Sequence, residues 1–262
     1  GWGDVATIVP WQHYMAYGDK RILENQFPSM KAWVDFIVGQ CSEPYLWNTG
    51  WHYGDWLFYS VDNDTSGVSA VTYKPLIQQC FFAKAAAVLG LEKEAAYYAD
   101  VAAKAREAFC NAYLTPAGYL VSATQTAYVL ALNFDMLPES MRPVVAARLA
   151  DKVREYGHIT TGFLGTPYIC HVLSEWGYTD LAYMLLLRQQ YPGWLYPVTM
   201  GATTIWERWN SMMPDRTIPN NGMNSFNHYS YGAIGDWLYR DAVGLHETSA
   251  GFKTMAVKPH TG

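Results

Sequence analysis

Long stretches with the apolar spacing of helices follow one another along most of the chain. In residues 20–40 the apolar positions recur at alternate steps of four and three, which places them on one face of a helix. These positions are Leu23, Phe27, Met30, Val34 and Ile37. Further helices are expected over residues 5–17, 69–89, 92–113, 124–137, 142–156, 165–176, 179–190 and 224–240. Because successive helices joined by glycine-containing turns form αα-hairpins, the sequence predicts an all-α ring of hairpins.

The segments between these helices are rich in aromatic residues. Residues 41–66 combine Trp, Tyr and Gly with polar side chains and have no sustained period, so a long functional loop is expected there. Residues 191–197 form a second aromatic loop, and residues 212–222 are polar and broken by Pro and Gly. In a closed ring of hairpins the connecting loops gather at one end. The aromatic loops therefore predict a pocket at that end.

Composition narrows the class of ligand. Aromatic residues make up 16% of the chain, with 11 Trp and 20 Tyr, which exceeds the needs of a core and favours an aromatic cleft. The net charge is −5 and there is no run of Lys or Arg, so a nucleic-acid partner is not expected. The sequence contains no run of about 18 apolar residues, so a membrane-spanning helix is not expected. No metal-ligand spacing or phosphate loop is present, so neither a metal nor a cofactor is expected.

One motif concentrates the chemistry. The sequence Gly-Ala-Thr-Thr-Ile-Trp-Glu-Arg-Trp over residues 201–209 places Glu207 between Trp206 and Trp209, with Arg208 beside it. Flanking indoles partly desolvate a carboxylate. Sugars have apolar C–H faces that lie on indole rings and hydroxyl groups that bind carboxylates, so the motif favours a carbohydrate pocket. The alternative is an ordinary helix start, capped by one of the two threonines, with the glutamate in its first turn.

Hydrolysis of a glycoside needs two carboxyl groups on opposite sides of the bond that breaks. Glu207 is the best candidate for the base. Its partner, or further groups that bind sugar hydroxyls, would come from Asp4, Glu43, Asp55, Asp62 and Asp64, which lie in aromatic or glycine-rich surroundings. His228, in an Asn-His-Tyr sequence, is near enough along the chain to share the pocket, although a lone histidine is more often structural.

Several motifs together resemble a known family. They are Gly1-Trp-Gly-Asp, Ile8-Val-Pro-Trp11, Gly54-Asp-Trp-Leu57, Thr124-Gln-Thr-Ala-Tyr128, Thr161-Gly-Phe-Leu-Gly-Thr-Pro167, the motif of residues 201–209 and Met223-Asn-Ser-Phe-Asn-His-Tyr229. In this order they are similar to the catalytic-domain signatures of bacterial α-L-rhamnosidases of glycoside hydrolase family 78. The resemblance covers nearly the whole chain, and its last two motifs are the most specific. It implies an (α/α)6 barrel that removes terminal α-L-rhamnose from rhamnose-containing oligosaccharides or glycosides with inversion.

The resemblance also implies roles for single residues. Glu207 resembles the general base that activates water, and His228 resembles a contact to the rhamnose hydroxyls. Trp2 and Trp56 resemble walls of the sugar pocket that meet its apolar side and methyl group. Asp55 is a weaker candidate for a sugar contact. Asp4 and Trp206, which stand in the same motifs, complete the set of expected substrate-binding residues.

One departure from the family pattern concerns the general acid. In the family it is a Glu in an Asp-Glu-Arg-x-Gly-Trp-type segment ahead of the Gly-Trp-Gly-Asp motif, and no such segment occurs in these 262 residues. The chain is therefore expected to be a piece of a longer bacterial protein, cytoplasmic, periplasmic or secreted, and to be inactive by itself. Residues 1–248 would form a barrel incomplete at its N-terminal side. Residues 249–262 would begin a C-terminal β-sandwich domain, since they alternate apolar and polar side chains.

Two other functions stay open on the sequence. The first is another (α/α)6 carbohydrate enzyme, such as an unsaturated glucuronyl hydrolase or a glucoamylase-like hydrolase. An acidic sugar would call for a cationic pocket, and the few arginines near the aromatic loops favour a neutral deoxysugar instead. The second is a non-catalytic carbohydrate-binding domain that keeps the aromatic surface. Replacing Glu207 by Gln separates these classes, because only a glycosidase would lose turnover.

Overall fold

The computed structural model describes residues 2–41, 43–50, 53–59, 78–219 and 223–261. Its α-helices are α1 (Val5–Tyr17), α2 (Arg21–Gln40), α3 (Gln78–Val88), α4 (Glu92–Tyr113), α5 (Gln125–Asn133), α6 (Arg142–Tyr156), α7 (Thr166–Glu175), α8 (Thr179–Leu187), α9 (Leu195–Thr199) and α10 (Ile234–Trp237). The strands are β1 (Leu245–Glu247) and β2 (Met255–Val257). The part of the expected helix 69–89 that precedes Gln78 lies outside the described residues.

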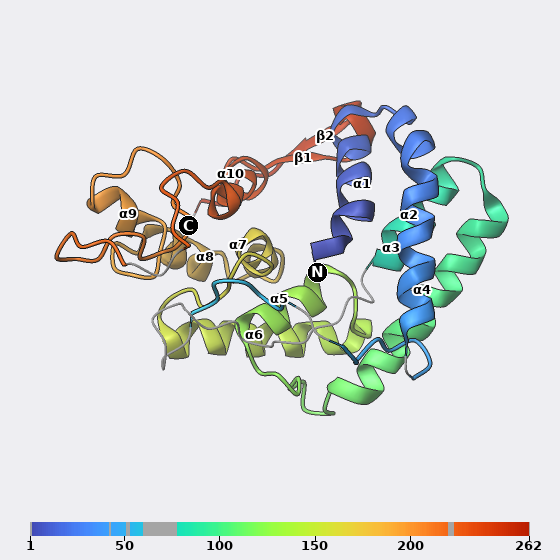
Figure 1. The fold of residues 1–262 in the computed structure, drawn as a ribbon, viewed down its shortest axis with the longest axis horizontal. Coiled ribbons are helices and arrows are strands. Elements are labelled where there is room, and N and C mark those ends of the chain that lie inside the picture. Colours follow the sequence, from blue (N-terminus) through green and yellow to red (C-terminus); the bar gives the residue numbers. More distant parts are fainter. Residues whose placement is uncertain (1, 42, 51–52, 60–77, 220–222, 262) are drawn as a thin grey trace.

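The helices pack as antiparallel hairpins, as the sequence predicts. Among the described residues α1 pairs with α2, α3 with α4, α5 with α6 and α7 with α8. A second set of contacts joins α1 to α3, α5 to α7 and α7 to α10, so alternate helices form an inner layer. Figure 1 shows α1 to α4 standing together on one side, with α5 and α6 below and α7 to α10 opposite. The arrangement is an arc of hairpins around a common centre.

The turn between α1 and α2 shows how the sequence sets a hairpin. Gly18 follows α1 with a φ of 69°, in the left-handed region that glycine adopts without steric cost. Its N–H donates to the Tyr14 carbonyl oxygen at 2.7 Å and satisfies the last turn of the helix. Pro10 and Pro28 are both accommodated inside their helices.

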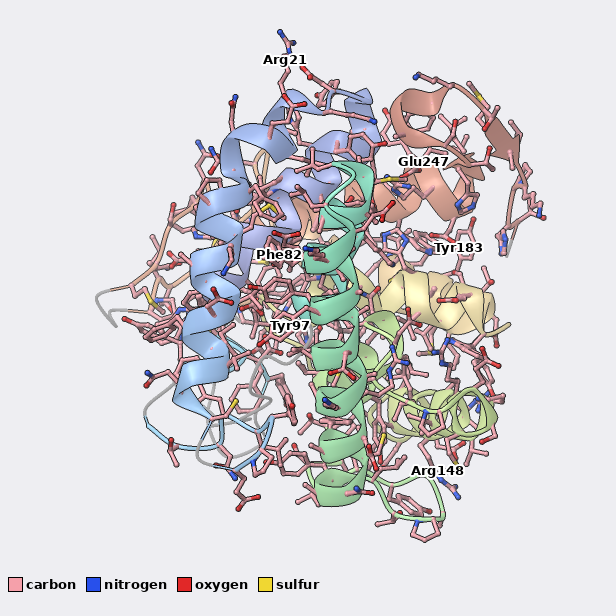
Figure 2. The ribbon with its side chains drawn as sticks, turned by 90° about the vertical axis from the view of Figure 1, so that its right-hand side faces the viewer. Arg21, Phe82, Tyr97, Arg148, Tyr183 and Glu247 are labelled. Atoms are coloured by element: carbon pink, nitrogen blue, oxygen red, sulfur yellow. The ribbon has the colours of Figure 1, made fainter. Side chains whose placement is uncertain are left out.

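The expected apolar face of α2 is confirmed. Leu23, Met30 and Val34 are fully buried in a cluster that also contains Phe82 and Tyr98, from α3 and α4. The Phe82 ring lies 4.5 Å from that of Tyr98 and fills the space between the helices (Figure 2). A second, larger cluster is built mainly from α4 to α8 and α10. Burial of these apolar faces drives the hairpins together.

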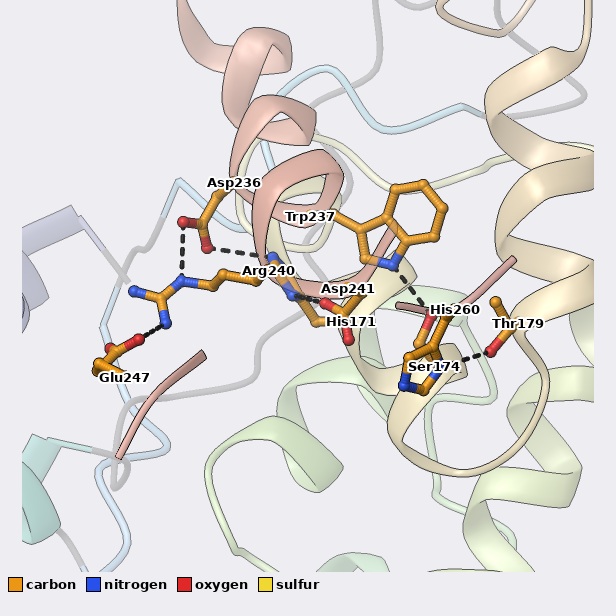
Figure 3. A network of polar contacts seen from close by, with 9 residues as sticks. All are labelled: His171, Ser174, Thr179, Asp236, Trp237, Arg240, Asp241, Glu247 and His260. Atoms are coloured by element: carbon orange, nitrogen blue, oxygen red, sulfur yellow. Dashed lines mark hydrogen bonds and ion pairs between the residues drawn. The ribbon is translucent and has the colours of Figure 1, made fainter. Parts of the chain in front are cut away.

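Residues 230–242, which we call the α10 segment, continue past α10 in a π-helical turn over Leu238–Ala242. A polar network ties α7 to the end of this segment (Figure 3). The His171 ring lies between two carboxylates, with Nδ1 at 2.6 Å from Asp241 Oδ2 and Nε2 at 3.2 Å from Asp236 Oδ2. Asp236 also accepts from Arg240 at 2.9 Å, and Arg240 pairs in turn with Glu247 on β1. Burial alone would lower the pKa of His171, but the two carboxylates raise it to about 9. The imidazolium therefore holds this part of the fold together.

The expected helix 224–240 begins later than its sequence suggests. A 3-10 turn covers Ser230–Ala233, and α10 follows it. The preceding residues are not helical because their backbone pairs with the stretch around Glu207: the Glu207 N–H donates to the Ser225 carbonyl oxygen at 2.8 Å, and the His228 N–H donates to the Ile205 carbonyl oxygen at 2.9 Å. For the same reason residues 203–209 are not helical, so the alternative of a helix start at this motif is wrong. The aromatic loop 191–197 ends in the short helix α9.

The C-terminal residues form a small antiparallel hairpin in which Leu245 pairs with Val257. In Figure 1 this hairpin extends from α10 toward α1, where residues 250–252 pack on the end of α1 around Gly18. The two strands lie on either side of the expected boundary between residues 248 and 249. The division into two domains stays a prediction.

Candidate active site

The loops that precede the inner helices meet at one end of the arc. The Phe163 N–H, just ahead of α7, donates to the Trp56 carbonyl oxygen at 2.9 Å. The Tyr231 hydroxyl, just ahead of α10, donates to the Leu57 carbonyl oxygen at 3.1 Å. Trp2 stands at the start of α1, with its ring 6.3 Å from that of Phe163. Segments far apart in the sequence are thus joined at the end where the sequence predicts a pocket.

Five rings in contact form what we call the aromatic cup, which consists of Trp2, Tyr53, Trp56, Phe163 and His228. The Tyr53 ring lies 6.3 Å from that of Trp2 and 5.9 Å from that of Trp56, edge to face in both cases. The His228 ring stacks on that of Phe163 at 5.1 Å. Trp2 is 44% exposed, so its ring is accessible from solvent. The structure thereby brings together Trp2, Trp56 and His228, which the sequence nominated separately.

Glu207 is held beside the cup by its backbone and its neighbours. The pairing of residues 205–207 with residues 225–228 sets Glu207 and His228 on two backbone segments that are hydrogen-bonded to each other. Arg208 and Trp209, which follow it, are 2% exposed and anchor the motif, while Glu207 itself is half-buried. Its charge acts on Tyr231, whose pKa is raised first by burial and also by the charges of nearby acidic groups that include Glu207. Tyr231 in turn contacts Phe163 at 5.1 Å, which links the carboxylate to the cup.

Asp55 lies beneath the cup and not on its surface. It is 1% exposed, and its carboxylate accepts hydrogen bonds from the Thr126 hydroxyl and from the N–H groups of Gly162 and Leu164, the last two at 2.7 Å. Burial raises the pKa of Asp55, while these donors act in the opposite direction. The expected contact with a sugar hydroxyl stays a prediction. The geometry favours a role in positioning the loop ahead of α7.

Asp4 and Trp206 are also buried. Asp4 is 5% exposed at the start of α1, hydrogen-bonds to Trp33, and has a pKa raised by burial to about 7. Trp206 is 4% exposed, packs edge to face on Phe226 at 5.3 Å, and lines a cavity of about 260 Å³ together with Trp194. Their expected contacts with substrate stay predictions.

The remaining carboxylates that the sequence nominated are not placed in the cup. Glu43 is exposed in the loop that follows α2. Asp62 and Asp64 lie outside the described residues. In the part of the chain that the structure describes, no three His, Cys, Asp or Glu side chains gather closely enough to hold a metal ion. None of its helices has both the length and the apolar character needed to cross a membrane.

Sequence reasoning gave no role to Phe163, Tyr53 or Tyr231, which the structure places in or under the cup. The signal for Phe163 was present. A large apolar residue stands between two glycines in a loop before a helix, where solvent exposure would be expected unless the ring served a site. Gly162 has no room for a side chain, because a Cβ there would lie 2.1 Å from the Trp56 carbonyl oxygen.

Comparison with known proteins decides the family. A family model described as the bacterial alpha-L-rhamnosidase 6 hairpin glycosidase domain matches residues 1–242. The chain belongs to this family. An alpha-L-rhamnosidase of Streptomyces avermitilis is 38% identical over 268 residues, which cover 100% of this chain and 25% of that protein. One from an Alteromonas species is 38% identical and covers 99% of this chain and 29% of that protein. The chain thus spans little more than a quarter of the length of these rhamnosidases.

Solved structures of rhamnosidases confirm the expected fold class. The crystal structure of the Streptomyces avermitilis alpha-L-rhamnosidase complexed with L-rhamnose matches with a TM-score of 0.86 and 36% identity, over 99% of this chain and 25% of that chain. Native rhamnosidase from Aspergillus terreus gives a TM-score of 0.91 and 34% identity, over 100% of this chain and 31% of that chain. The arc of hairpins is therefore part of the six-hairpin glycosidase fold of this family.

Proposed function

We propose that the aromatic cup holds a terminal α-L-rhamnose unit and that Glu207 activates the water that cleaves its glycosidic bond with inversion. The observation that carries this proposal is the convergence on one cup of three residues nominated separately by the sequence, with Glu207 beside it. The family match supports the reaction class, and the rhamnose complex of the Streptomyces relative supports the sugar.

The reaction follows from the chemistry of these groups. The Glu207 carboxylate takes a proton from water as the water oxygen bonds to the anomeric carbon, on the side opposite the leaving oxygen. The bond from the anomeric carbon to the leaving oxygen breaks, and a second carboxylic acid gives that oxygen a proton. The family resemblance assigns this acid to a segment that does not occur in these 262 residues. The first product of an α-rhamnoside would be β-L-rhamnose.

The cup would supply binding and orientation. The indole of Trp2 is exposed and that of Trp56 is partly buried, and both can cover the apolar C–H face of the sugar. His228 is partly buried; its Nδ1 accepts from the Ser230 N–H at 3.4 Å, which leaves Nε2 to bond to a sugar hydroxyl. Asp55, buried under the loop of Phe163, and Asp4, buried at the start of α1, would position the backbone that carries these rings. A neutral sugar suits a cup whose walls are rings and whose charged neighbour is a carboxylate.

The test is hydrolysis of an aryl α-L-rhamnoside by the complete gene product. Proton NMR of the released sugar during the first minutes distinguishes the two anomers before they interconvert. The proposal expects β-L-rhamnose to appear first. Accumulation of the α-anomer first would contradict a single displacement, and binding of L-rhamnose without any hydrolysis would favour a carbohydrate-binding module.

A further inference from the structure

Phe163 has the most constrained position in the aromatic cup. Its ring contacts three others: it stacks on His228 at 5.1 Å, meets Tyr231 edge to face at 5.1 Å, and meets Trp2 edge to face at 6.3 Å. The side chain is nevertheless only partly buried. A ring with three aromatic neighbours and some exposed surface presents a fixed apolar wall.

The backbone that carries this ring is clamped from below. The carboxylate of Asp55 accepts from the N–H groups on both sides of Phe163, at Gly162 and Leu164, each at 2.7 Å. The Phe163 N–H is itself bonded to the Trp56 carbonyl oxygen at 2.9 Å. Three consecutive backbone N–H groups are thus fixed by residues 55 and 56. Because charge-assisted hydrogen bonds in a buried site are strong, the backbone that carries the ring is held in place.

A glycine in the loop makes the clamp possible. A Cβ at Gly162 would lie 2.1 Å from the Trp56 carbonyl oxygen and 2.7 Å from the Phe58 nitrogen, far closer than atoms tolerate. The close approach of this loop to residues 55–58 therefore depends on the absence of a side chain at Gly162. Gly165 serves a different contact, because a Cβ there would lie 2.7 Å from the Thr161 side chain and 2.9 Å from Thr126 Oγ1.

We propose that Phe163 is a specificity-determining residue that packs against the methyl group of a 6-deoxy sugar and disfavours the same sugar with a hydroxyl at carbon 6. This inference rests on the proposed function and adds to it the group that recognises the deoxy position. The family resemblance gives the methyl contact to Trp2 and Trp56. In this proposal the two indoles cover the flat face of the sugar, and the Phe163 ring meets the methyl group. A hydroxyl placed against the ring would lose its bonds to water and find no partner there.

The size of the effect follows from general limits on apolar pockets. An apolar wall discriminates against an added hydroxyl by roughly a hundredfold, because the larger group is desolvated without a hydrogen bond. Removing the wall lets water reach carbon 6, so the methyl loses its advantage. Selectivity should then fall by at least about tenfold.

The experiment compares two substrates in the complete gene product: an aryl α-L-rhamnoside and the aryl α-L-mannoside, which differs only by the hydroxyl at carbon 6. The readout is the ratio of the two kcat/KM values. Phe163→Ala is expected to lower this ratio at least about tenfold, mainly through a higher KM for the rhamnoside. The control is Tyr239→Ala, which removes a 68% exposed ring that lies after α10 and outside the aromatic cup, and it should leave the ratio unchanged.

An unchanged ratio in folded Phe163→Ala overturns the inference, as does an equal fall in Tyr239→Ala. If Phe163→Ala does not fold, Phe163→Tyr decides the question. Its ring fits the same space and sets a hydroxyl in the cup, so the ratio should move toward the mannoside, and no movement overturns the inference. A wild-type protein that cleaves neither substrate refutes the proposed function instead, which keeps the two failures apart.

Discussion

Replacing Asp55 by Asn tests how much the clamp under the cup contributes to stability. The amide has nearly the same shape, so it probes the charge and the acceptors without leaving a cavity. Oδ2 accepts from Thr126 and Gly162, and Oδ1 accepts from Leu164. The amide nitrogen would take the Oδ1 position, because there it faces only the Leu164 N–H, while the amide oxygen keeps accepting from Thr126 and Gly162. We expect the free energy of unfolding to fall by about 3 kcal/mol.

That magnitude has two parts. The Leu164 N–H is left without an acceptor in a site that is 1% exposed, which costs about 1–3 kcal/mol. The two remaining hydrogen bonds lose the charge that makes them about twice as strong as neutral ones. Release from burying a charge offsets part of this loss, as the raised pKa of Asp55 indicates. A loss of about 3 kcal/mol is large against the typical stability of about 5–15 kcal/mol.

The assay is urea unfolding followed by tryptophan fluorescence, with the slope on urea concentration checked for two-state behaviour. The control is Asp151→Asn, a surface carboxylate whose side chain is 61% exposed and whose partners are Arg148 and Arg154. It should change the free energy of unfolding by no more than about 0.5 kcal/mol. A loss below about 1 kcal/mol in Asp55→Asn would refute the clamp, because it would mean that the buried donors find other acceptors.

Four further substitutions test the fold at other positions. The neighbouring carboxylates raise the pKa of His171 to about 9, so its contribution to the free energy of unfolding is complete below about pH 6.5 and is lost as the pH rises through about 9. His171→Gln should therefore lower the free energy of unfolding by about 2 kcal/mol at pH 6 and by little at pH 10. Urea titrations at the two pH values measure this difference. Gly162→Ala should cost more than about 2 kcal/mol in the same assay, whereas Gly39→Ala, where a Cβ meets nothing within 4 Å, should stabilise α2 by up to about 1 kcal/mol. Thr124→Ala removes the oxygen that caps α5 and should lower the melting temperature, through a loss of about 1 kcal/mol.

Local patterns predicted the helices well where the chain itself marks their ends. The bounds of α1, α4 and α6 agree with the expectation, and Gly18 and Gly157 end their helices in the left-handed conformation. The helix expected from residue 124 begins there, because the Thr124 side chain caps α5. In each case the stabilising contacts are a few residues apart, so the sequence window contains both partners.

The site could be predicted in composition but not in arrangement. Asp55 bonds to backbone N–H groups more than a hundred residues away, and no local pattern reveals such partners. The late start of the α10 segment has the same origin, since residues 225–228 pair with residues 205–207 in place of forming a helical turn. The roles of Glu207 and of the cup residues stay predictions that rest on proximity and on the family match.

The most direct test of the account is the turnover of an aryl α-L-rhamnoside by Glu207→Gln in the complete gene product, measured beside the affinity for L-rhamnose by calorimetry. If Glu207 activates water next to the aromatic cup, kcat falls by at least about a hundredfold while the dissociation constant for rhamnose changes little. Turnover that survives the substitution with rhamnose still bound would contradict the assignment of Glu207 as the base.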